Sequence, residues 1–310
     1  MAWLLKAGVA AALLAWLLAQ VDLHALTRLL ADQSPTGLLG AIVIVCLALV
    51  VGTFKWWLLL PDEPFFRLLR LNIAANFYAL VVPGQVGAEA IKTYQLGRGR
   101  VDAEAIAASV VLDKITGLLS LLALGVVGAV FSSLPLGQVS RVSLAALLVL
   151  CFAVLVGLRF PVVRAFAVGC VRTLQAAMPR LRELGNRIIL FVDAWCNYLS
   201  KPGVILASLA AGVLQQSIYV VMISLLSRQL GFELPLLDWC WIFGLASAAA
   251  VLPITIAGLG VREGVFVGLL ASVSIPAEQA LALSLTIFAI QVVLGLLGGL
   301  VELLRVARPG

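Results

Sequence analysis

Charged and amide side chains inside otherwise apolar runs are the residues of this sequence that could do chemistry. Four pairs qualify: Asn72 and Asn76, Glu89 and Lys92, Asp113 and Lys114, and Arg262 and Glu263. A charge inside a bilayer costs several kcal/mol unless it is paired or hydrated, so these charges are candidates for function. The three cations could hold an anionic headgroup. In the alternative interpretation, the opposite charges form buried salt bridges that only brace the fold.

Two breaks rich in proline and glycine precede the charges at Glu89 and Arg262. The stretch 65–98 is interrupted by Pro83, Gly84, Gln85, Val86 and Gly87, and the stretch 236–273 is interrupted from Pro253 through Gly258 to Gly260. Proline removes a backbone donor, so each stretch is expected to form two short helices that meet at the break. Both re-entrant hairpins and full crossings are compatible with the lengths, and limbs of about 17 residues favour hairpins. A helix that starts at such a break offers free N–H groups to a phosphate oxygen.

Residues for metal or triad chemistry form no pattern. The single histidine, His24, stands alone, and the five cysteines are far apart without a CxxC spacing. The sequence has no P-loop either, so direct use of ATP is not expected. We therefore predict no metal, no cofactor and no enzyme activity. An intramembrane enzyme that uses Glu89, Asp113 or Glu263 as acid or base on a lipid phosphate is kept as an alternative.

The elements that position these residues are expected to be membrane helices. The 310 residues are 63% hydrophobic and 12% charged, with a mean hydropathy of +1.14, which excludes a soluble globular domain. Six runs are long enough to span a bilayer: about 4–20, 37–60, 103–131, 142–160, 203–227 and 277–304. The predicted fold is an all-α polytopic membrane protein in one domain, 1–310, with about six spans and two broken hairpins.

The distribution of basic residues predicts the orientation. With both termini in the cytoplasm, 16 of the 21 Lys and Arg residues, among them Lys55, lie inside. Three lie outside, and two, Lys114 and Arg262, lie at membrane depth. The basic linker 161–202 is typical of an amphipathic helix on the anionic cytoplasmic leaflet. An ordinary loop that only sets the topology is the alternative for this linker.

The two halves of the chain, about 37–160 and 203–304, carry an internal similarity. A shift of 174 positions aligns Glu89 with Glu263 and Glu104 with Glu278. In the predicted topology the two hairpins enter from opposite sides, so the halves would be inverted repeats. Transporters with such repeats bind their substrate near the bilayer midplane, at broken helices.

Three segments carry a resemblance to a known family. They are Asn72 to Asn76 with Pro83-Gly84-Gln85-Val86-Gly87-Ala88-Glu89 and Lys92-Thr93-Tyr94, the segment 109–117 around Asp113 and Lys114, and Pro253 through Gly258-Leu259-Gly260-Val261-Arg262-Glu263-Gly264. In these segments the chain resembles the flippase-like membrane region of lysylphosphatidylglycerol synthases, the multiple peptide resistance factors of bacteria. It is also similar to stand-alone membrane proteins that share this region without the synthase domain.

The resemblance implies a flippase that moves an anionic, aminoacylated or polyprenyl-linked lipid between leaflets of a bacterial or archaeal cytoplasmic membrane. The partners are then membrane phospholipids or lipid-linked intermediates, not nucleic acid, and a homo-oligomer stays open. We expect the headgroup to contact Asn72, Asn76, Pro83, Gly84, Gly87, Glu89, Lys92, Tyr94, Asp113, Lys114, Pro253, Gly258, Gly260, Arg262 and Glu263. The aminoacyl-transferring domain is expected to be absent. A non-transporting scaffold that recruits lipid or glycan enzymes through the basic linker is a further alternative.

Overall fold

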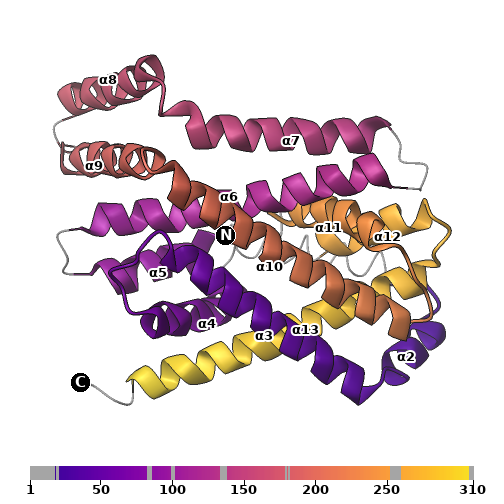
Figure 1. The fold of residues 1–310 in the computed structure, drawn as a ribbon. Helices are drawn as coiled ribbons and strands as arrows, with labels where there is room; N and C mark the ends of the chain where they lie inside the picture. The colour runs from indigo at the N-terminus through magenta and orange to yellow at the C-terminus, as the bar shows by residue number, and fades with distance from the viewer. Residues whose placement is uncertain are drawn as a thin grey trace.

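The structure is a computed structural model that describes residues 18, 21–81, 86–98, 102–132, 138–178, 180, 182–251 and 260–306. The regular elements of these residues are helices (Figure 1). In chain order they are α2 (Leu23–Ala31), α3 (Pro35–Trp57), α4 (Phe65–Val81), α5 (Val86–Gly97), α6 (Ala103–Phe131), α7 (Gln138–Gly157), α8 (Pro161–Ala177), α9 (Arg182–Leu199), α10 (Pro202–Gln229), α11 (Leu236–Val251), α12 (Val261–Ala271) and α13 (Ala277–Val306).

Four of these helices, α3, α6, α10 and α13, are long and apolar enough to cross a membrane. Helices α7 and α8 meet the same criterion only as a pair, which is bent by 74°. The polytopic helical fold is thus confirmed, but the described residues provide four spans, or five with the bent pair, where six were predicted. The predicted first span, 4–20, lies outside the described residues except for Leu18.

Apolar side chains cover the outside of the bundle. They recur every three or four residues along α3 and α13, which places them on one face of each helix: Leu39, Val43, Leu47, Val50 and Phe54 on α3, and Leu296, Leu300 and Leu303 on α13. Continuous apolar faces of this size are not stable in water. The outer faces of α3 and α13 are therefore expected to contact lipid.

Helices α3 and α10 pack closely and run in opposite directions. Gly37, near the start of α3, lies against Gln229 at the end of α10, and Gly52 lies against Gln215. The contacts move toward the start of α10 as they move toward the end of α3, so the two helices are antiparallel. The end of α3 and the end of α10 therefore lie at opposite ends of the bundle.

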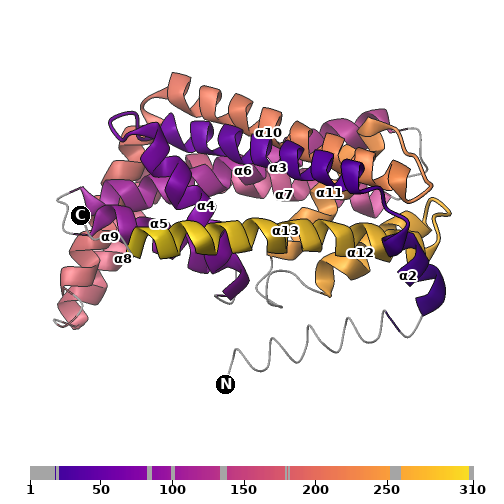
Figure 2. The same ribbon diagram turned by 90° about the horizontal axis from the view of Figure 1, so that it is seen from below.

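Two helix pairs, α4 with α5 and α11 with α12, lie toward these opposite ends of the bundle (Figure 2). At the first end, the indole of Trp56, at the end of α3, donates to Ser109 Oγ near the start of α6 at 3.2 Å. Because α4 follows α3 and α5 precedes α6, α4 begins and α5 ends on that side. At the other end, Gln279 at the start of α13 donates to the carbonyl of Leu230, directly after α10, at 3.0 Å. Because α11 follows α10 and α12 precedes α13, α11 begins and α12 ends on that side. The predicted breaks, 83–87 and 253–260, lie outside the described residues except for Val86 and Gly87, which begin α5, and Gly260, which precedes α12.

Each hairpin packs on the long helix of the other half of the chain. Helix α4 packs on α13, and α11 packs on α6. Glycines make both contacts: a Cβ at Gly298 would lie 2.3 Å from the carbonyl oxygen of Ile73, and a Cβ at Gly128 would lie 2.4 Å from that of Leu237. Small residues let membrane helices approach this closely, and the gain is van der Waals packing. The two halves are thereby interlocked.

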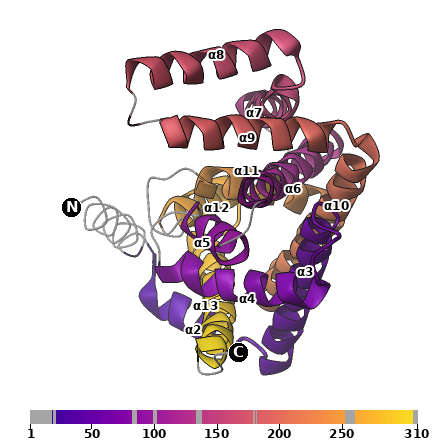
Figure 3. The same cartoon turned by 90° about the vertical axis from the view of Figure 1, so that its left-hand side faces the viewer.

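The basic linker forms two helices, where the sequence suggested one. Helices α8 and α9 pack on each other and lie across the direction of the long helices; Figure 3 shows α8 and α9 lengthwise and α6 and α7 nearly end-on. Helix α9 also packs on α6. The two helices are thus attached to the bundle at the end where α10 begins.

Candidate functional site

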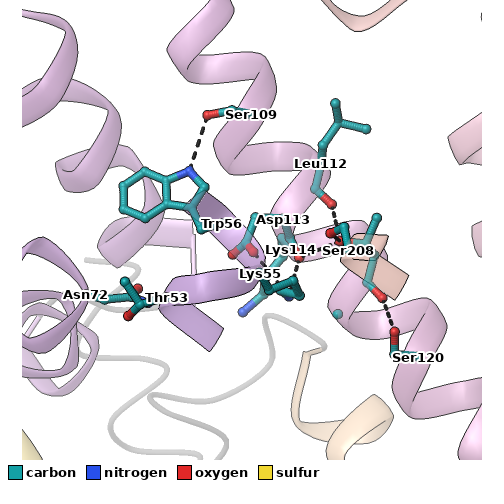
Figure 4. Close-up of polar contacts among 12 residues, drawn as sticks. Thr53, Lys55, Trp56, Asn72, Ser109, Leu112, Asp113, Lys114, Ser120 and Ser208 are labelled. Carbon is teal, nitrogen blue, oxygen red and sulfur yellow. Dashed lines mark hydrogen bonds and ion pairs between the residues drawn. The ribbon is translucent and has the colours of Figure 1, made fainter. Parts of the chain in front are cut away.

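The most deeply buried cation of the first half is Lys55, close to the end of α3. It is 4% exposed, and its Nζ lies 3.2 Å from Oδ1 of Asp113 on α6. The same ammonium donates to the backbone carbonyl of Asp113 at 2.7 Å (Figure 4). Gly117 provides the space, because a Cβ there would lie 2.7 Å from the Lys55 Nζ. The pair therefore joins α3 to α6.

A second ion pair, between Glu89 and Lys92, lies on one face of α5. The two side chains are separated by 2.5 Å and three positions, which is the spacing of neighbours on a helix surface. Lys92 also donates to the amide oxygen of Asn72 on α4 at 3.3 Å, and Asn72 donates to Thr53 on α3 at 3.0 Å. This chain of contacts connects both limbs of the first hairpin to α3.

An indole ring closes one side of the group. The Lys92 Nζ lies 5.0 Å from the centroid of the Trp56 ring, which is within the range of a cation–π interaction. The fully buried Trp56 is held in turn by its hydrogen bond to Ser109. The aromatic face stabilises the charged form of Lys92 without adding a counter-charge.

Lys55, Lys92, Lys114, Glu89 and Asp113 together form what we call the lysine cluster. It contains three ammonium groups and two carboxylates, and Lys114 lies 3.8 Å from Glu89. The Lys114 side chain is 44% exposed, although this residue is about 17 Å along α6 from Ala103. That depth is near the middle of a hydrocarbon layer about 30 Å thick. The cluster thus has one more positive than negative charge and an accessible lysine at mid-depth.

The charged residues of the second hairpin form a smaller and more enclosed group, the arginine pair of Arg262 and Glu263. Their side chains are 3.0 Å apart, and Glu263 is completely buried. Glu263 also accepts from the backbone N–H of Gly260 at 2.6 Å and from Ser284 on α13 at 3.0 Å. Gly260 has a φ of 84°, a left-handed conformation that favours glycine. Arg262 donates to Gln291 on α13 at 3.0 Å.

Other predicted site residues lie apart from these two groups. Asn76 donates to the carbonyl of Asn72 at 2.9 Å, within its own helix. Tyr94 is 61% exposed, and its ring stacks with Arg98 at 5.8 Å. Gly87 is in the first turn of α5. Pro83, Gly84, Pro253 and Gly258 lie outside the described residues.

Sequence reasoning missed one member of the lysine cluster and two of its neighbours. Lys55 was counted as a cytoplasmic charge that sets the orientation, and Thr53 and Trp56 were not considered. Lys55 follows a long apolar run and precedes two tryptophans, which is a weak signal for a buried lysine. Its partner Asp113 is 58 positions away, so only the packing of α3 on α6 could identify the pair.

Comparison with known proteins places this arrangement among other membrane proteins. The family model of the lysylphosphatidylglycerol synthase transmembrane region matches residues 3–299. A UPF0104 membrane protein of Methanothermobacter thermautotrophicus is 23% identical, in an alignment that covers 83% of this chain and 80% of that protein. The family match includes both hairpins, the lysine cluster and the arginine pair.

Proposed function

Because this chain belongs to the family of the lysylphosphatidylglycerol synthase transmembrane region, as its sequence segments indicated, we propose that it is a lipid flippase. The substrate is an anionic lipid, or an aminoacylated or polyprenyl-linked lipid with a phosphate, in a bacterial or archaeal cytoplasmic membrane. Its headgroup crosses the bilayer along the protein while its acyl chains stay in the surrounding lipid. The four long apolar helices support the multi-pass membrane location on which this proposal depends.

The observation that carries the proposal is the accessible Lys114 next to buried ion pairs. A lysine at the middle of a membrane is costly unless it contacts water or a counter-charge. The lysine cluster has an excess of one positive charge, and a phosphate diester supplies one negative charge. A structural brace would be more stable with equal numbers of cations and carboxylates. The charge balance therefore favours a binding site for an anion.

We propose different roles for the two hairpins. The first hairpin holds the headgroup, because its Glu89 and Lys92 are next to the accessible Lys114. The second hairpin braces the site, because the carboxylate of Glu263 is fully buried and bonded to Gly260, Arg262 and Ser284. Lys92 can exchange Glu89 for the phosphate without unfolding the protein, because Glu89 keeps Lys114 as a neighbour, whereas Glu263 cannot leave its partners at low cost.

The halves of the chain act in our proposal as inverted repeats. Support comes from the antiparallel pairing of α3 with α10, the opposite openings of the two hairpins, and the reciprocal packing of α4 on α13 and of α11 on α6. Inverted repeats transport their substrates when one repeat moves against the other around a central site. The reciprocal glycine contacts would be the surfaces on which the halves move.

The test is transport by the purified protein in liposomes, with a fluorescent phosphatidylglycerol whose outer-leaflet fraction is measured by chemical quenching. Lys114→Gln removes the accessible charge and should lower the transport rate about tenfold, because a charge-assisted hydrogen bond contributes roughly 1.5–3 kcal/mol. Arg228→Gln is the matched control, since it removes one exposed cation that pairs with Glu233 at the other end of α10. This control should transport at the wild-type rate.

Equal rates for wild-type protein, Lys114→Gln and empty liposomes would contradict the flippase proposal. The same samples test the enzyme alternative, because mass spectrometry of the recovered lipid would detect a product with altered mass. The scaffold alternative predicts that cells with Lys114→Gln behave like wild-type cells. It also predicts that cells in which the arginines of α8 and α9 are replaced behave like cells that lack the protein. The flippase proposal predicts that Lys114→Gln alone abolishes the phenotype.

A further inference from the structure

A second cationic site lies at the elbow where α7 meets α8 and α9. A cavity of about 470 Å³ opens there, and its walls come from the end of α7, one face of α8 and the facing side of α9. Three arginines line it, namely Arg159, Arg164 and Arg172. Arg164 and Arg172 are eight positions apart, which puts them on the same face of α8. We call this cavity the arginine groove.

The lining of the arginine groove contains one acidic side chain. Asp193 on α9 lies 2.6 Å from Arg164, and both side chains are about half exposed. The hydrogen bond to Asp193 raises the pKa of Arg164, so this guanidinium is charged at every physiological pH. Arg159 and Arg172 remain as two further charges of the same sign, and the groove therefore has an excess of positive charge.

The position of α8 puts the groove at the level of lipid headgroups. Helix α8 is bent by 74° from α7, so it lies nearly parallel to the membrane plane if α7 crosses the membrane. Val162 and Phe166, one turn apart, are 80% and 74% exposed, and they lie on the opposite side of α8 from Arg164. An interfacial helix inserts such an apolar face into the acyl boundary and keeps its basic face among the phosphates.

We propose that the arginine groove binds the phosphate of an anionic phospholipid in the leaflet that contacts α8. Arginine suits this ligand, because its planar guanidinium donates two parallel hydrogen bonds to phosphate oxygens. The exposed apolar face holds α8 at the level of the headgroups, so the acyl chains of this lipid point into the adjacent hydrocarbon layer. A membrane lipid fits better than a soluble phosphate, since insertion of Val162 and Phe166 places the groove within the headgroup layer. This site is separate from the lysine cluster and does not depend on the transport proposal.

Native mass spectrometry of the full chain in a mild detergent tests the site. The probes are phosphatidylglycerol, phosphatidylcholine and soluble glycerol 3-phosphate. The test variant is Arg159→Gln with Arg172→Gln, which leaves the pair of Arg164 with Asp193 intact. The matched control is Arg180→Gln with Arg182→Gln, which removes two exposed charges that do not line the groove.

Wild-type protein and the control should retain phosphatidylglycerol about tenfold more strongly than phosphatidylcholine, because both lipids carry a phosphate but the arginines repel the choline cation of phosphatidylcholine. The groove variant should lose this preference while its thermal unfolding stays unchanged. Equal losses in both double variants would overturn the proposal, because they would indicate general surface attraction. Displacement of the lipid by an equal concentration of glycerol 3-phosphate would also overturn it. Neither measurement requires transport, so the result is independent of the flippase test.

Discussion

Glu89 and Glu263 both lie in the first turn of the second helix of a hairpin, yet their surroundings differ. Glu89 is partly exposed, and its neighbours are two lysines from α5 and α6. Glu263 is fully buried, and its neighbours are one arginine, one hydroxyl and one backbone N–H. Glu89 can therefore lose one of its two lysines and keep the other, whereas Glu263 has a single arginine as its counter-charge.

For the inverted repeats that we propose, this difference teaches that similar folds do not require similar chemistry. The positions that match Lys55, Asp113 and Lys114 after the shift of 174 are Gln229, Ile287 and Phe288. In the proposed repeat, the second half has a hairpin, the matching glutamate and a glycine contact of its own, but not the ions that match the lysine cluster. One half can then hold a charged ligand while the other maintains the geometry. Substitutions at matched positions in the two halves test this division.

The largest effect is expected for Glu263→Ala. The change leaves the buried Arg262 without its counter-charge and the Gly260 N–H without its acceptor, so we expect a loss of about 3–5 kcal/mol in the free energy of unfolding. Thermal unfolding in detergent measures this loss. Glu89→Ala should cost clearly less, because Lys92 keeps its contacts with Asn72 and Trp56. Equal losses for the two variants would remove the proposed distinction between the hairpins.

A somewhat smaller effect is expected for Lys55→Met. This change leaves the carboxylate of Asp113 largely buried without its lysine, at a cost of roughly 3 kcal/mol. The double variant with Asp113→Asn should regain most of that stability, because it removes the orphaned charge as well. A double-mutant cycle on unfolding temperatures measures the coupling. Additive losses would show that the two residues do not stabilise each other. The double variant should fold but transport poorly if the cluster binds the headgroup.

The smallest effect on stability is expected at the two glycine contacts, between α4 and α13 and between α11 and α6. Gly128→Ala and Gly298→Ala each place a methyl group against backbone of the opposite half, so each should cost about 1–3 kcal/mol of stability. Gly169→Ala is the control, since a Cβ there meets open space. A loss in only one of the two test variants would contradict the equivalence of the halves.

Much of the fold could be predicted from the sequence because the apolar runs and their breaks are local signals. The run 103–131 coincides with α6, and the stretch 65–98 separates into α4 and α5 around the break at Pro83. The linker was harder, because 161–202 has the composition of one amphipathic helix although it folds back as α8 and α9. The charges of the linker indicate that it lies at a surface, but they do not indicate the position at which the chain turns between α8 and α9.

The candidate site could be predicted only in part, since charge in an apolar run does not identify its partner. Asp113 was found by its depth in an apolar run and Glu89 by its place after a break, whereas Lys55 lies near a helix end and was assigned to the cytoplasmic face. Tyr94 was included because of its place in a sequence motif, but two residues after Lys92 it lies on another face of α5, where it contacts Arg98. Partners that are 58 positions apart come together through packing of α3 on α6, which no local pattern records.

The packing of α4 on α13 also has a consequence for how the protein is made. Synthesis proceeds from the amino terminus, and α13 follows every other described helix. The glycines that receive α4 therefore do not exist while the ribosome is still adding α5 to α12. During that interval the first hairpin must wait in the membrane without its final neighbour, and a chain truncated before α13 would leave α4 without the helix on which it packs.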